Sequence, residues 1–322
     1  MQKRISVLII FVLFFLCFEI LTESKNILNS VSFALSIWKD NVFPSLFPFF
    51  VLSEIMVKYG IPEFIGYLLK PFMNKLFKIN SSAAFILVMS IISGNPANAK
   101  YTRELYFNGS LNKWEATKIL CFSCFANPLF ILGTVSVFFL KNQKVGYLIL
   151  FCHYIGNLIV GLLFRNFHPS KNEKTKYNLK KSISMMHEKR ISNKNNFGTI
   201  FTNSLVNSIN TLLLILGVIT ICLVLTTIID NNISLNSVFQ SILNGFIEMT
   251  QGLKYISMEN LSLKIKAVLS TIIISFGGFS VHLQIISILS DTDIKYAPFL
   301  ISRLLHSLIA GIITFILFDV YL

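Results

Sequence analysis

The sequence predicts an all-α polytopic integral membrane protein, built as an inverted repeat with two re-entrant, broken-helix segments. Hydrophobic residues make up 54% of the 322 residues and charged residues only 13%, which is too little charge for the surface of a soluble domain. Several stretches approach or exceed the roughly 18–20 apolar residues that a membrane span requires. Two other apolar runs, one in each half, stop at a small-residue break and continue as polar sequence. Such interrupted pairs are typical of secondary transporters.

The first span is expected at about 5–21, within an N-terminal anchor at 1–27. Two basic residues precede it, as in a secretory signal, but no small-residue cleavage site follows, so we expect an uncleaved span that starts in the cytosol. Pro44 and Pro48 loosen the backbone ladder of the next span, 28–57, as a hinge or as a tolerated kink. The other continuous spans are expected at about 115–140, 145–164, 200–229 and 296–319.

A basic segment, 165–198, separates the first membrane repeat, 28–164, from the second, 199–322. Its excess of positive charge predicts a cytosolic loop. We expect this loop to contact anionic lipid headgroups and not nucleic acid, because the remaining basic residues also lie between hydrophobic segments. Its charged residues are Arg165, Lys171, Glu173, Lys174, Lys176, Lys180, Lys181, Glu188, Lys189, Arg190 and Lys194.

A cytosolic loop at 165–198 fixes the direction of the neighbouring spans. The run 81–113 must then start and end on one side, which a re-entrant hairpin folding back at Gly94–Pro96 achieves. By the same argument 265–290 folds back at Gly277–Gly278, and the last span returns to the cytosol. The segment 237–256 fits either a true span or an interfacial helix.

The two breaks present helix N-termini to a solute. Gly94 opens the backbone, and Asn95-Pro96 is typical of an N-cap followed by the first residue of a new helix. Free N–H groups and the helix dipole at such an end favour an anion, and Lys100 and Arg103 follow within about two turns. We therefore expect a small anionic solute. The residues expected to line its site are Ser93, Gly94, Asn95, Asn98, Lys100, Arg103, Asn127, Gly277, Gly278, Ser280, His282 and Gln284.

These polar residues also have structural interpretations. Lys100 and Arg103 can extend to the cytosolic interface, and Asn127 can cap a kinked helix. Glu248 can pair with Arg303 or His306 in a purely structural contact, or act with His282 as a carrier of coupling protons. The residues assigned to coupling or structure are Glu248, Thr250, Arg303 and His306.

The chain shows no catalytic constellation. No nucleophile–base pair, phosphate-binding loop or zinc-ligand pattern stands out, and Cys121-Phe-Ser-Cys124 lacks a second pair of ligands. We therefore expect no enzyme activity, no cofactor and no metal. Transport would be secondary or passive, because no ATP-binding motif is present.

Five motifs, spread in order over most of the chain, resemble the YlbJ-type sporulation integral membrane proteins, which contain paired nucleoside-recognition Gate segments. The resemblance implies transport of dipicolinate, a small planar dianion, across the outer forespore membrane. Where that family usually has an aromatic residue and a glycine, this chain has Asn95 and Asn98, which would narrow the site or change the solute. The motifs are Phe43-Pro-Ser-Leu-Phe-Pro-Phe-Phe-Val-Leu-Ser-Glu54, Ser93-Gly-Asn-Pro-Ala-Asn-Ala-Lys100, Asn127-Pro-Leu-Phe-Ile-Leu-Gly-Thr-Val135, Glu248-Met-Thr-Gln-Gly252 and Phe276-Gly-Gly-Phe-Ser-Val-His-Leu-Gln284.

Two other functions remain open. A nucleoside transporter would use the amides of Asn95, Asn98 and Gln284 to hydrogen-bond a base and ribose. A non-transporting scaffold would recruit spore-envelope or other sporulation membrane proteins, or a second copy of the chain. The scaffold hypothesis predicts that the basic loop 165–198 matters and that the breaks do not.

Overall fold

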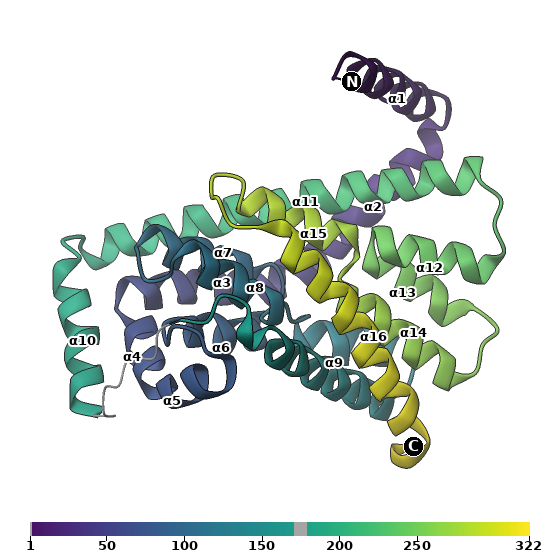
Figure 1. Ribbon diagram of the computed structural model, residues 1–322. Coiled ribbons are helices and arrows are strands. Elements are labelled where there is room, and N and C mark those ends of the chain that lie inside the picture. Colours follow the sequence, from purple (N-terminus) through teal and green to yellow (C-terminus); the bar gives the residue numbers. More distant parts are fainter. Residues whose placement is uncertain (1, 171–178) are drawn as a thin grey trace.

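The computed structural model describes residues 2–170 and 179–322, and this part of the chain is helical without strands (Figure 1). Met1 and the charged residues Lys171, Glu173, Lys174 and Lys176 of the basic loop lie outside the described residues. The elements of the first half are α1 (Gln2–Thr22), α2 (Ser24–Ile37), η1 (Trp38–Val42), α3 (Phe43–Lys58), α4 (Ile61–Leu68), α5 (Lys70–Phe72), η2 (Met73–Phe77), α6 (Ala83–Ser93), α7 (Ala97–Phe107), α8 (Lys113–Phe122), η3 (Phe130–Phe139), α9 (Gln143–Leu163) and η4 (Phe164–Asn166). Those that follow are α10 (Leu179–Ser192), α11 (Phe197–Asn232), α12 (Ser237–Ile247), α13 (Met249–Met258), α14 (Leu263–Phe276), α15 (Gly278–Ile288) and α16 (Tyr296–Tyr321).

Within the described residues, five helical segments are long and apolar enough to cross a membrane, and a bent pair makes a sixth. The bent pair, Ser24–Val42 with Leu46–Lys58, turns through 54° close to Pro44, where a missing backbone N–H weakens the helix. These segments confirm the prediction of an all-α polytopic membrane protein. The five segments are Ile5–Thr22, Gln143–Asn166, Phe197–Asn232, Leu263–Ile288 and Tyr296–Tyr321.

The two halves of the chain present their elements in the same order. A long segment comes first (α2–α3 and α11), then two short helices that pack on each other (α6 with α7, α12 with α13). An interrupted segment follows (α8–η3 and α14–α15), and a continuous helix closes each half (α9 and α16). Each half therefore contains two breaks, where the sequence indicated one.

The fold-back of the second half lies at Glu248 and not at Gly277–Gly278. α14 and α15 continue as one candidate span, whereas α12 and α13 pack against each other around Glu248. Backbones can approach this closely only where side chains are absent: a Cβ on Gly252 would lie 2.0 Å from Gly245 Cα. The segment 237–256 is thus a helical hairpin, neither a continuous span nor a single interfacial helix.

The expected span 115–140 is also interrupted. α8 ends at Phe122, and η3 begins at Phe130 after a largely non-helical stretch. Pro128 supplies no N–H to a continuing helix and disfavours the helical conformation of the residue before it. This break gives the first half a second interruption beside the one at Gly94–Pro96.

Polar contacts divide the loops into two ends of the molecule. One end carries the basic loop, whose helix α10 packs on α4. α16 starts near this end, where Asp293 pairs with Lys113, and runs away from it (Figure 1) to Asp319, which pairs with Lys264. The expected return of the last span to the basic-loop side is therefore wrong. Contacts at the basic-loop end are Lys58–Glu104 (3.1 Å), Lys189–Glu63 (3.8 Å), Lys113–Asp293 (3.0 Å) and Lys78–Asn166 (2.7 Å); those at the opposite end include Asn232–Glu19 (2.9 Å) and Ser237–Glu259 (2.9 Å).

Candidate functional site

A cavity of about 320 Å³ lies where the four helix breaks meet, and it is called the central cavity below. Its volume is at the lower end of the range that small-molecule sites occupy, roughly 300–1,000 Å³. α11 and the bend between α2 and α3 complete the wall, mainly with apolar side chains. The polar residues that line it are Asp40, Asn41, Asn95, Asn127, Thr134, Glu248, Thr250, Ser280 and Gln284.

The two breaks of the first half are held against each other by Asn127. Its side-chain amide donates to Ser93 O (3.0 Å), the carbonyl at the end of α6, and its Oδ1 accepts from Leu129 N (2.7 Å). Gly94 makes this contact possible, since its backbone (φ 79°, ψ −173°) is one that essentially only glycine adopts. A Cβ there would lie 2.5 Å from Asn127 N.

A fully buried arginine holds the end of α8. Arg303 donates to Cys121 O (2.6 Å), Cys124 O (3.1 Å) and Asn157 Oδ1 (2.8 Å). The two carbonyls belong to the C-terminal end of a helix and the residues just beyond it, where acceptors lack intrahelical partners and a positive charge is favoured. Arg303 therefore fixes the break that presents Asn127 to the cavity.

Two histidines extend this network. Arg303 donates to His306 Nδ1 (2.9 Å), and His306 Nε2 donates to His153 O (2.7 Å). His153 Nε2 accepts from Ala126 N (2.9 Å) beside the cavity. Glu248 stands apart from these residues: it caps α13 by accepting from Gln251 N (2.9 Å).

Two buried polar atoms of the cavity lining have no hydrogen-bond partner among the residues that the structure describes. They are Asn95 Oδ1 and Ser280 Oγ; the latter lies beside the Glu248 carboxyl without a well-formed hydrogen bond. A buried unpaired polar atom costs about 1–3 kcal/mol, and a ligand or an ordered water can remove this cost. A ligand that forms hydrogen bonds with these two atoms would therefore be favoured in the cavity.

The basic side chains expected at the site lie elsewhere. Of the described residues, those that line the central cavity include two with carboxyl groups, Asp40 and Glu248, and neither Lys nor Arg. Lys100 and Arg103 line a second cavity of about 930 Å³ at the basic-loop end, called the vestibule below. Both are paired, Lys100 with Glu54 and Arg103 with Asp291.

Only some of the other expected residues line the central cavity. Asn95, Asn127, Ser280 and Gln284 line the central cavity. Gly94, Gly277 and Gly278 shape the backbone at the breaks, and Ser93 contributes the carbonyl that Asn127 binds. Asn98 is buried with both side-chain polar atoms unpartnered, outside the cavity lining. His282 is held by Tyr296 Oη (2.8 Å) and Phe276 O (3.1 Å).

Sequence reasoning missed the contribution of the α2–α3 bend. Asp40 and Asn41 line the cavity there, and Asn41 Oδ1 accepts from Thr134 Oγ1 (2.9 Å). A charged residue inside an apolar run is a sign of function in membrane proteins. Asp40 within the run 28–57 was therefore a usable signal.

Comparisons with known proteins agree with this architecture. The family model Gate, described as "Nucleoside recognition", matches residues 41–143, the part that carries both breaks of the first half. The sporulation integral membrane protein YlbJ of Bacillus subtilis (strain 168) is 34% identical over 340 aligned positions, which cover 98% of this chain and 83% of that protein.

The chain belongs to the YlbJ family of sporulation integral membrane proteins. No solved structure matches it. The family assignment and the candidate spans together establish a multi-pass membrane protein of sporulation.

Proposed function

We propose that this YlbJ-family protein carries a small solute across the membrane through the central cavity, with dipicolinate as the first candidate. The observation that carries the proposal is the convergence of four helix breaks on one cavity with unpartnered buried polar atoms. Irregular backbone at membrane depth is tolerated where it is enclosed by protein or lines a cavity, and transporters place their substrate sites at such breaks.

The lining suits a small planar molecule. Phe130, Ile215 and Ile219 offer apolar surface for a ring. At its edge, the Ser280 hydroxyl can donate a hydrogen bond to a carboxylate, and Asn95 Oδ1 can accept one from a protonated group. Asn95 and Ser280 come from opposite halves of the chain. A solute bound between them would contact both halves at once, as alternating access requires.

The charge of the lining sets a condition on an anionic solute. A dicarboxylate beside an ionised Glu248 would be repelled unless a proton or a cation accompanied it, whereas the exposed Asp40 carboxylate already pairs with Lys39 (3.6 Å). We therefore propose that transport is linked to protons, with Glu248 as the carrier, because it lies buried on the cavity wall. Within the cell, we place the protein in the outer forespore membrane, which faces the mother cell.

A nucleoside is the second candidate. Two observations favour it: the matching family model is described as "Nucleoside recognition", and the cavity combines amides and carboxyl groups with no basic residue. Amides and carboxylates hydrogen-bond the edges of bases and the hydroxyl groups of ribose.

Binding separates the two solutes. A ligand that binds the folded state raises its stability by about 2.7 kcal/mol at a concentration 100 times its Kd, so purified protein is heated with dipicolinate, with nucleosides, or with neither. We expect dipicolinate to raise the melting midpoint, and to raise it less in Ser280→Ala. A rise with nucleosides alone would transfer the proposal to the second candidate, and no rise with either would contradict a solute site in this cavity.

A further inference from the structure

The central cavity and the vestibule lie end to end along the same three helices. Residues four apart on a helix share a face, and on each of these helices a step of four leads from a residue of one cavity toward a residue of the other. Lys189 and Asn193 of the basic loop also line the vestibule. A central cavity that opens toward the basic-loop end would therefore open through the vestibule. The steps are Leu46–Phe50–Glu54 on α3, Ile215–Thr211 on α11 and Gln284–Ile288 on α15.

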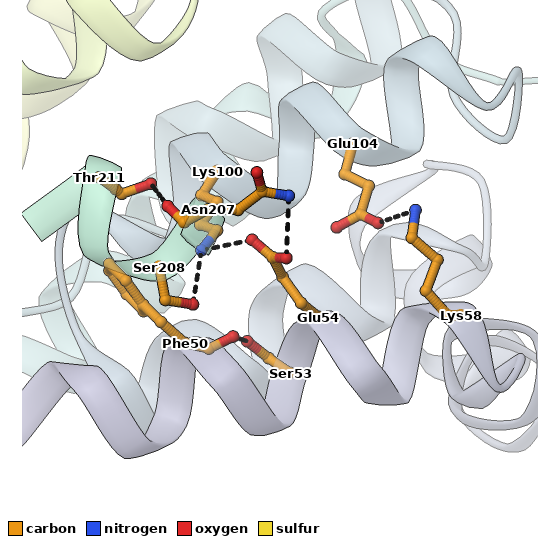
Figure 2. Close-up of polar contacts among 9 residues, drawn as sticks. All are labelled: Phe50, Ser53, Glu54, Lys58, Lys100, Glu104, Asn207, Ser208 and Thr211. Atoms are coloured by element: carbon orange, nitrogen blue, oxygen red, sulfur yellow. Dashed lines mark hydrogen bonds and ion pairs between the residues drawn. The ribbon is translucent and has the colours of Figure 1, made fainter. Parts of the chain in front are cut away.

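An ion pair on the vestibule wall, Glu54 with Lys100, lies beside the aromatic ring of Phe50 (Figure 2), which is one step of four from Leu46 of the central cavity. Lys100 Nζ lies 2.7 Å from Glu54 Oε1 and 4.5 Å from the centre of the Phe50 ring. The two charged side chains are only 11% and 8% exposed, and Phe50 is fully buried. A charge pair so little exposed is screened much less by salt than a surface pair.

The pair joins three elements that belong to both halves of the chain. Lys100 comes from α7, the polar arm of the first hairpin, and Glu54 from α3. α11 completes the group, because Asn207 Nδ2 donates to Glu54 Oε2 (3.3 Å) and Lys100 Nζ donates to Ser208 Oγ (3.5 Å). The hairpin that presents Asn95 to the central cavity is thereby tied to the long helices beside it.

A second ion pair on the same helices provides a comparison. Lys58 and Glu104 lie one turn further along α3 and α7 and also line the vestibule. The side chains of Lys58 and Glu104 are 49% and 20% exposed, so both are more accessible to water than those of Lys100 and Glu54. The two pairs therefore differ in burial while sharing chemistry and neighbouring positions.

We propose that the Glu54–Lys100 ion pair, backed by Phe50, is a gate that closes the passage between the central cavity and the vestibule. Opening the gate requires the α7 arm to part from α3 and α11, which frees Lys100. The proposal rests on the transport function proposed above and deepens it, since it assigns the closure on the basic-loop side to named residues. An anionic solute in the passage would compete with Glu54 for the Lys100 ammonium group, which gives the gate a preference for anions that the central cavity lacks.

The test measures access to the central cavity without any solute. A reporter, Ile215→Cys, is placed on the cavity wall, and inverted membrane vesicles are treated with a charged, water-soluble thiol reagent; the chain without the reporter gives the baseline of the native cysteines. We expect Glu54→Gln or Lys100→Met to speed labelling of the reporter about tenfold, equivalent to about 1.4 kcal/mol in the closing equilibrium. The exchanged pair, Glu54→Lys with Lys100→Glu, should return labelling toward the parent rate.

The matched control is Lys58→Met, which removes the neighbouring pair and should leave the labelling rate unchanged. Equal rates in the parent and in both gate variants would overturn the proposal. So would an equal acceleration by the control variant, because the effect would then be general loosening. Each variant is first checked for a monodisperse profile in detergent. Since labelling needs no solute, a working gate in a protein that transports nothing would contradict the transport function alone.

Discussion

Replacing Gly94 with alanine tests whether the two breaks of the first half depend on direct backbone contact. Gly94 has φ 79° and ψ −173°, a backbone conformation whose cost for other residues is about 1–3 kcal/mol. The added Cβ would also meet Asn127 N, Cα and Cβ at 2.5, 2.6 and 2.8 Å. Overpacking of this kind costs about 1–3 kcal/mol more, so Gly94→Ala should destabilise the protein by about 2–6 kcal/mol.

The matched control is Gly109→Ala. Gly109 also has a positive φ (76°), but a Cβ there would meet nothing within 4 Å, so only the backbone cost of about 1–2 kcal/mol applies. Thermal unfolding of both variants in detergent, followed by the loss of the monodisperse peak in gel filtration, gives the comparison. Gly94→Ala should unfold at a clearly lower temperature than Gly109→Ala. Equal midpoints would refute the contact between the breaks.

Three further predictions concern other parts of the fold. Gly252→Ala should prevent the α12–α13 hairpin from closing, because its Cβ would lie 2.0 Å from Gly245 Cα, and gel filtration should show little monodisperse protein. Arg303→Met should lower stability by about 2–5 kcal/mol in thermal unfolding, since four buried acceptors lose their donor. Arg103 lowers the pKa of the Asp291 carboxyl, so the pair stabilises the fold above the ordinary aspartate pKa and loses this effect as the pH falls through the lowered value. Asp291→Asn should therefore differ from the parent in thermal stability at pH 7 and match it well below about pH 4.

Each of these has a control. Gly217→Ala adds a Cβ in open space and should be tolerated, so equal damage by Gly217→Ala would contradict the hairpin argument. Arg303→Lys keeps the charge without the planar fork and should fall between Arg303→Met and the parent; a Met variant as stable as the parent would show that the network is dispensable. The Asp291 effect should disappear in about 1 M salt, and a difference that persists at low pH would point to a cause other than the ion pair.

Composition and hydropathy were sufficient to predict the fold class and most of the spans. They also located the break at Gly94–Pro96, because a glycine followed by Asn-Pro cannot continue a helix. They could not distinguish a hairpin from a span at 237–256, since two antiparallel arms and one crossing helix have the same hydropathy. The Gly245 and Gly252 pair was the available signal for close backbone contact.

The break at Gly277–Gly278 shows a second limit. Paired glycines predict an interruption, but the sequence does not state the angle, and here the two arms continue as one candidate span. The ion-pair partners of the basic side chains could not be predicted from the sequence either. The partners of Lys100 and Arg103, Glu54 and Asp291, lie far away in sequence, so nothing local revealed that both basic groups are already neutralised.

Uptake of labelled dipicolinate into proteoliposomes tests the central claim most directly. The account predicts saturable uptake that increases when a proton gradient is imposed and that Ser280→Ala weakens, because Ser280 offers its unpartnered hydroxyl to the cavity. Gly109→Ala, which is in the lining of neither cavity, should transport like the parent. Absence of uptake by monodisperse parent protein, with and without the gradient, would contradict the claim and favour the scaffold hypothesis.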